Sequence, residues 1–111
     1  RSDGRFELEN KQSHLVSMVG DYYDMGPCAV VRRGGVTLLL TSIRTAPFDL
    51  SQWHSQGVAV EKLNVIVVKA AIAHRAAYDP ITVRSFFTVD TPGACSSNLK
   101  CLPYQHLRIS A

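Results

Sequence analysis

The sequence lacks both a membrane-spanning apolar run and the signature of a common catalytic loop. Its longest apolar runs, residues 36–40 and 65–68, are far shorter than the roughly 20 residues of a transmembrane helix, so we expect no membrane partner. No G-x-S-x-G, G-x-G-x-x-G or Walker sequence is present, and these absences leave no nucleophile elbow and no phosphate-cradling loop. The residues alone therefore predict no complete catalytic centre.

Cysteine is scarce, and the 3 cysteines form no even set for a disulfide framework. With no N-x-S/T acceptor site either, we expect free thiols and a cytoplasmic location. Cys95, Cys101 and His106 have the spacing C-x5-C-x4-H, which matches no usual zinc motif. The other histidines fall on separate predicted elements, so we expect no metal site built from this chain alone.

Positive charge is present but dispersed. The net charge is +3, and Arg32-Arg33 is the only adjacent basic pair, whereas a nucleic-acid partner would require a basic stripe with interleaved aromatic residues.

The apolar fraction of 46% and the charged fraction of 19% are ordinary for a globular protein, and 111 residues fit one domain, residues 1–111. The first residue is Arg1 rather than Met, which is compatible with removal of a targeting segment or a preceding domain.

The clearest local pattern is a β-hairpin. Residues 28–32 and 36–43 are β-branched or aliphatic runs, and Gly34-Gly35 between them can adopt the positive φ of a primed turn. Because the second run hardly alternates, we expect it to be covered on both faces. Residues 6–9 and 14–19 are further expected strands.

Two helices are predicted by their boundaries and composition. Asp49 or Ser51 can cap a helix over residues 50–56 that Gly57 ends, and Trp53 on it is expected to be a packing anchor. The second, alanine-rich helix covers residues 70–78 and ends before Asp79-Pro80.

The second helix lies between two apolar runs, residues 63–68 and 82–89. A crossover of this length, about 11 residues, is near the minimum for joining parallel strands. We therefore predict a strand–helix–strand unit. The expected fold class is α/β, with α+β as the alternative: a mixed sheet with a β-hairpin, this unit and few short helices.

Parallel strands would place the candidate site at one edge. Lys69 ends the first strand and Asp90 the second, with Thr91 beginning the next turn, and ligands in such sheets bind beyond the carboxyl ends of the strands. Lys69 and the helix N-terminus would favour an anion. The alternative is a surface ion pair of Lys69 with Asp90, which contributes little.

His74 and Arg75 are the remaining candidate site residues. His74 could carry a proton or donate a hydrogen bond to a substrate carbonyl, and it shares a helical face with Tyr78. The alternative is a histidine that is only solvated or packed.

Several motifs occur in an order that resembles a known family. They are RSDGRF at residues 1–6, GPCAVVR at 26–32 followed by GGV at 34–36, Thr41-Ser42, VVK at 67–69 with HRA at 74–76, and VDTPG at 89–93. Together they look like the C-terminal domain of the microcystinase C (MlrC) family, whose members are described as zinc metallopeptidases. The sequence departs from the usual family pattern, because Lys69-Ala70 stands where Lys-Ser is usual and Ala73-His74-Arg75 where His-Phe-Arg is usual.

The resemblance implies a polypeptide with a larger N-terminal catalytic domain, absent from this chain, that carries the zinc ligands. The family acts on small linearised peptides, such as those formed in microcystin degradation. The chain would complete the cleft of that domain and be inactive alone, with Lys69, His74, Arg75, Asp90 and Thr91 as candidate substrate-binding residues and none catalytic. The alternatives are a structural module that forms a homo-oligomer through residues 36–40 and Trp53, or a small-anion-binding domain at Lys69.

Overall fold

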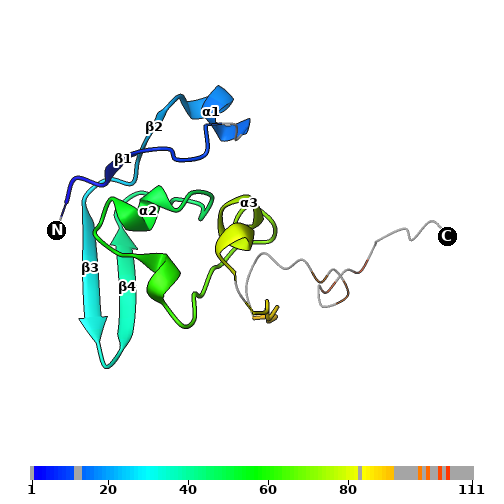
Figure 1. Cartoon of the computed structure of the whole chain (residues 1–111). Helices are drawn as coiled ribbons and strands as arrows, with labels where there is room; N and C mark the ends of the chain where they lie inside the picture. The colour runs from blue at the N-terminus through cyan, green and yellow to red at the C-terminus, as the bar shows by residue number, and fades with distance from the viewer. Residues whose placement is uncertain are drawn as a thin grey trace.

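The computed structural model describes residues 2–11, 14–82 and 84–91 and the single positions 98, 100, 103 and 105. Its elements are short: two antiparallel pairs of strands come first, with one short helix between the strands of the first pair, and the other short helices follow (Figure 1). In chain order they are β1 (Arg5–Glu7), α1 (His14–Val19), β2 (Tyr22–Asp24), β3 (Cys28–Arg33), β4 (Val36–Thr41), α2 (Ser51–His54), the 3-10 helix η1 (Val60–Lys62), α3 (Arg75–Tyr78) and the 3-10 helix η2 (Asp79–Ile81). This is a mixed α/β fold with few short helices, as predicted.

The predicted hairpin is confirmed. β3 pairs with β4 in antiparallel register, with Arg33 opposite Val36, so the loop is only Gly34-Gly35. Both glycines have positive φ, 53° and 79°, which is the conformation that a two-residue primed turn requires. The turn residues therefore set the register of both strands.

The hairpin is covered on one face only, contrary to the expectation of two covered faces. Cys28 is buried and Leu39 packs against the core from one face. The other face carries four exposed aliphatic side chains, which we call the aliphatic face: Val31, Val36, Leu38 and Leu40. Leu38 and Leu40 are each 52% exposed because no other described element packs over them.

The core lies where the N-terminal segment crosses the start of the hairpin. Phe6, Leu8, Met25, Cys28 and Phe48 form one buried cluster, and Tyr23 packs against it. The ring of Tyr23 meets that of Phe48 edge-on, with centroids 5.3 Å apart, a favoured aromatic geometry. β1 and β2 pair beside this cluster.

The segment at residues 14–19 is a helix, so the expected strand was wrong. The backbone N–H of Gly20 donates to the carbonyl of Val16 at 2.8 Å and closes the turn. Only two of the six residues, Val16 and Val19, are β-branched, and the others fit a helix well enough for one turn and a half.

The predicted parallel strands are also absent. Residues 63–68 and the described part of 82–91 form no strand, and α3 covers only Arg75–Tyr78 of the expected helix. Val65, Val67 and Phe87 are 77%, 87% and 88% exposed. β-Branched sequence favours a strand only when its side chains are buried, and no described residue buries these.

Among the described glycines, Gly4 leaves the least room for a side chain. Its φ is 75°, and a Cβ placed on it would lie 1.9 Å from the carbonyl oxygen of Gly26. The N-terminal segment can therefore cross the chain before β3 only with glycine at this position.

We predict that Gly4→Ala destabilises the domain more than Gly20→Ala. Both residues have positive φ, but a Cβ on Gly20 meets nothing within 4 Å. The control should lose about 1–2 kcal/mol for the left-handed backbone. Gly4→Ala should lose roughly 1–3 kcal/mol more from steric overlap. Urea unfolding measures both, and equal losses would contradict the crossing described above.

Candidate functional site

The structure does not bring the sequence-predicted site residues together at one sheet edge. Lys69, Asp90 and Thr91 are exposed, and the strands that would have aligned them are not formed. Asp90 accepts a hydrogen bond from the Nδ2 of Asn98 at 3.3 Å. Among the described residues Lys69 makes no ion pair with Asp90. The substrate-binding role of these residues stays a prediction, without the strand geometry that motivated it.

Arg75 and His74 lie at the start of α3. The Arg75 guanidinium is 4.0 Å from the Asp79 carboxylate, and it lies over the ring of Phe86 at 5.7 Å. His74 is half-buried, and its Nδ1 has no hydrogen-bond partner within the described part of the chain. Arg75 therefore lies in solvent beside Asp79, whereas the buried Nδ1 of His74 makes no hydrogen bond to the described residues.

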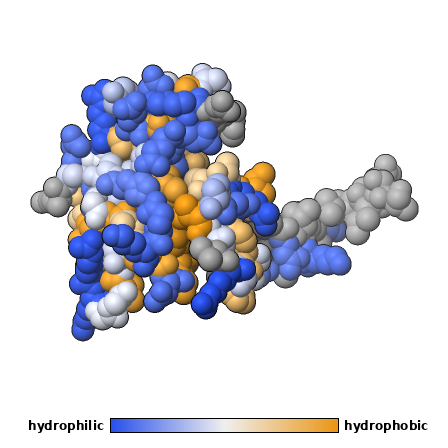
Figure 2. Space-filling view, viewed as in Figure 1, coloured by the Kyte–Doolittle hydropathy of each residue, from blue (hydrophilic) through white to orange (hydrophobic). Residues whose placement is uncertain are grey.

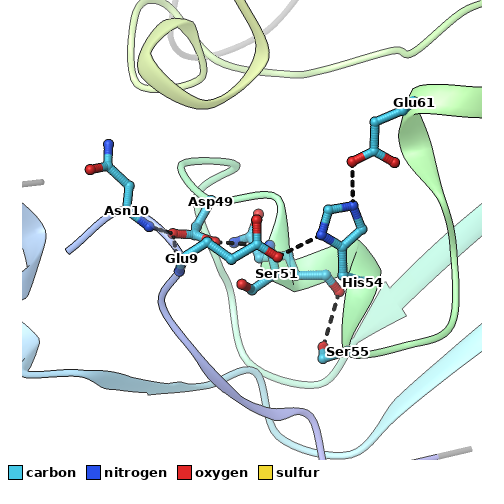
Figure 3. Close-up of polar contacts among 8 residues, drawn as sticks. Glu9, Asn10, Asp49, Ser51, His54, Ser55 and Glu61 are labelled. Carbon is cyan, nitrogen blue, oxygen red and sulfur yellow. Dashed lines mark hydrogen bonds and ion pairs between the residues drawn. The ribbon is translucent and has the colours of Figure 1, made fainter. Parts of the chain in front are cut away.

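A polar cluster that the sequence did not predict lies between the N-terminal segment and α2. Its centre is Asp49, whose side chain is only 2% exposed. Oδ2 of Asp49 accepts from the backbone N–H groups of Glu9 and Asn10 at 3.1 and 3.2 Å, and Oδ1 accepts from that of Ser51 at 2.8 Å (Figure 3). Three N–H donors offset the cost of burying the carboxylate.

His54 lies at the other end of α2, between two carboxylates (Figure 3). Its Nδ1 is 2.6 Å from Oε1 of Glu9, and its Nε2 is 2.7 Å from Oε1 of Glu61 in η1. The hydrogen bond to Glu9, followed by the negative charges of both glutamates, raises the pKa of His54 above its usual 6.5. The pKa of Glu61 is lowered, first by a hydrogen bond from its own backbone N–H and then by His54.

Trp53 connects α2 to α3. Its Nε1–H donates to the hydroxyl of Tyr78 at 2.8 Å, and Tyr78 is 3% exposed. Burial raises the pKa of the Tyr78 hydroxyl, so this group stays protonated at neutral pH. Trp53 is thus a packing anchor, as expected, rather than part of an exposed contact surface.

The arrangement offers no assembled hydrolytic centre. In the described residues no group of three or more His, Cys, Asp and Glu side chains is placed to hold a metal ion. A zinc ion therefore does not fit this part of the chain. Cys28 is buried, and burial raises the pKa of its thiol, which disfavours the nucleophilic thiolate. Cys95, Cys101 and His106 lie outside the described residues.

No helix in the described part of the chain is long and apolar enough to cross a bilayer.

The comparison with protein families decides the affiliation of the chain. The family described as MlrC C-terminus matches residues 2–106. The chain belongs to this family. No curated protein and no solved structure matches it. The match extends over nearly the whole chain and includes β1, the hairpin, α2, α3 and all five predicted site residues.

The sequence of this MlrC C-terminal domain indicates only one part of the polar cluster, the role of Asp49. Asp49 stands just before α2, a position that indicates a capping role, and it accepts the N–H of Ser51 as such a residue would. Nothing in the sequence links Glu9 and Glu61 to His54, because they are 45 and 7 positions away and belong to other elements.

We predict that Asp49→Asn destabilises the domain. Both carboxylate oxygens accept hydrogen bonds, so an amide would place an NH2 against a backbone N–H. The loss should be about 1–3 kcal/mol in chemical denaturation. Asp3→Asn is the matched control, since Asp3 is exposed and accepts only from the N–H of Arg5 at 3.2 Å. It should change stability by less than about 0.5 kcal/mol; a similar loss in both variants would contradict the role of Asp49.

Proposed function

We propose that this MlrC C-terminal domain works as the last part of a larger peptidase polypeptide. In this proposal the hydrolytic centre and its zinc ion belong to an N-terminal domain of the same polypeptide. The C-terminal domain completes the cleft that receives small linear peptides, and it has no activity alone. The membership in the MlrC C-terminus family is the observation that carries the proposal.

The distribution of apolar surface supports a domain that functions against another protein surface. The described residues leave many large apolar side chains exposed, among them Val65, Val67, Ile72 and Val89 at 77% or more. Figure 2 shows hydrophobic residues gathered across the middle of one face, with hydrophilic residues above them over β1, α1 and β2. Exposed apolar patches of this kind mark contact sites on soluble domains.

Substrate contact is assigned to the exposed segment around α3. Lys69 and Arg75 supply two cationic groups, which would pair with the carboxylate of a linear peptide. The imidazole of His74, half-buried at the start of α3, would hydrogen-bond the substrate near the scissile group. Asp90 and Thr91 would border the same cleft. The free thiol of Cys28 supports work in a reducing, cytoplasmic setting.

We expect Lys69→Ala, made in the complete polypeptide, to raise KM for linear peptides with a free carboxylate. Loss of one charge-assisted contact corresponds to roughly a 10-fold effect on kcat/KM. Arg33→Ala, an exposed cation at the hairpin turn, is the charge-matched control and should leave kinetics unchanged. Unchanged hydrolysis by the Lys69 variant would remove the substrate role of Lys69.

The aliphatic face of the hairpin favours a second function, self-association. Val31 and Leu38 are directly opposite each other and are 45% and 52% exposed, so the face is continuous across both strands. A two-stranded ribbon gains stability when such a face is covered. In this alternative the domain is a non-catalytic oligomerisation module, and the covering surface is a second copy of the chain.

Sedimentation velocity distinguishes this alternative. If the domain dimerises through the aliphatic face, Leu38→Glu should produce a monomer, because a carboxylate on that face opposes its burial. Thr41→Glu is the control, since Thr41 is exposed on the opposite face of the same strand. A monomeric wild-type domain, or a dimer that persists in the Leu38 variant, would exclude association through this face.

A further inference from the structure

The contacts of His54 with two carboxylates require a particular protonation state. A carboxylate can only accept hydrogen bonds, and a neutral imidazole has only one N–H to donate. Both ring nitrogens of His54 nevertheless lie within 2.7 Å of a glutamate oxygen. Both contacts are hydrogen bonds only when both nitrogens carry a proton. Loss of either proton would place a nitrogen lone pair against a carboxylate oxygen.

We propose that His54 is a proton-dependent clasp that fixes η1 and the segment after β1 to α2. In the imidazolium form it donates to Glu9 from Nδ1 and to Glu61 from Nε2, so it joins three parts of the chain. As the pH rises it loses one proton, and one of the two contacts becomes repulsive. The proposal uses none of the residues assigned to substrate binding.

The charges around the imidazole favour its protonated form. Glu9, in the segment after β1, and Glu61, in η1, face the two sides of the ring, and the negative charges of both raise the pKa of His54. A hydrogen bond from its own backbone N–H, and to the smallest extent the charge of Lys62, lowers the pKa of Glu61, which keeps Glu61 ionised. Asp49 lies at the opposite end of α2 with both oxygens occupied by backbone N–H groups. No positively charged side chain among the described residues contacts the ring.

The two partners of the clasp are held differently. The backbone at Glu9 is also bound by Asp49, and this contact does not involve His54. In η1 only Val60 is buried, whereas Glu61 and Lys62 are exposed. Deprotonation should therefore act mainly at η1, the element that begins the segment leading to Lys69. The clasp thus makes the order of that segment sensitive to pH.

The sign of the stability effect follows from the direction of the shift. The pKa of His54 is raised in the folded state, so the folded state binds the proton more tightly than the unfolded chain. The contribution of the clasp is complete below the ordinary pKa of 6.5 and is lost as pH rises through the folded value. It also weakens in acid, as the pH falls through the lowered pKa of Glu61 and that carboxylate becomes protonated.

An NMR titration of the histidine ring signals of the 111-residue chain tests the clasp. His54 should titrate above 6.5, and Glu61→Gln and Glu9→Gln should each lower its pKa, because each removes a negative partner of the ring. Glu7→Gln is the matched control, because Glu7 lies two residues before Glu9 but pairs with Lys11. A His54 pKa at or below 6.5, or one that is the same in all three variants, would overturn the proposal.

Amide hydrogen exchange at residues 60–63 gives a readout that a merely structural histidine would not change. After correction for intrinsic rates, wild-type protection should fall severalfold as the pH is raised across the His54 titration located by NMR. In His54→Gln, whose side chain does not titrate, protection should be low at both pH values. The same pH-dependent loss in the variant as in the wild type would contradict the clasp.

Discussion

The fold depends on one buried carboxylate. Asp49 accepts backbone N–H groups from Glu9 and Asn10, 40 and 39 positions earlier in the chain, and from Ser51 at the start of α2. A buried charge without such partners would cost several kcal/mol. The N-terminal segment is therefore held against α2 by its hydrogen bonds to the Asp49 carboxylate as well as by hydrophobic burial. Without this contact Glu9 would have no fixed position beside His54.

The local parts of the fold were accessible from the sequence. Gly34-Gly35 predicted the hairpin and its turn, because few other residues adopt two consecutive positive φ values. Asp49 and Gly57 bounded α2, and Asp79-Pro80 ended α3. Each of these features is determined by residues within a few positions of one another. Three of the predicted site residues, Lys69, Asp90 and Thr91, were instead derived from an assumed parallel sheet, which the described residues do not form.

What the sequence could not predict depends on distant neighbours. The contacts of His54 join three elements, and no spacing rule connects Glu9 with Glu61. The expected strands at residues 63–68 and 82–89 failed for a related reason. Their β-branched residues indicate a preference for burial, but the sequence does not say which surface provides it. Val67 and Phe87 remain largely exposed in this chain.

These exposed residues belong to the less buried half of this MlrC C-terminal domain. The small buried cluster around Phe6 and Met25 stabilises the N-terminal half, while the segment after η1 has few buried side chains of its own. Stability is therefore distributed unevenly along the chain. Regions with few buried contacts are the ones that respond most to a covering partner, to pH or to ligand.

The hydrogen bond from Trp53 to Tyr78 crosses the boundary between these two halves. Trp53 is the only tryptophan in the sequence, so the indole emission of the protein originates from one known position. Its N–H is bound to the phenol of α3, and the emission spectrum of an indole responds to the polarity around that group. The molecule thus carries a built-in fluorescent reporter of the contact between α2 and α3, without any added label.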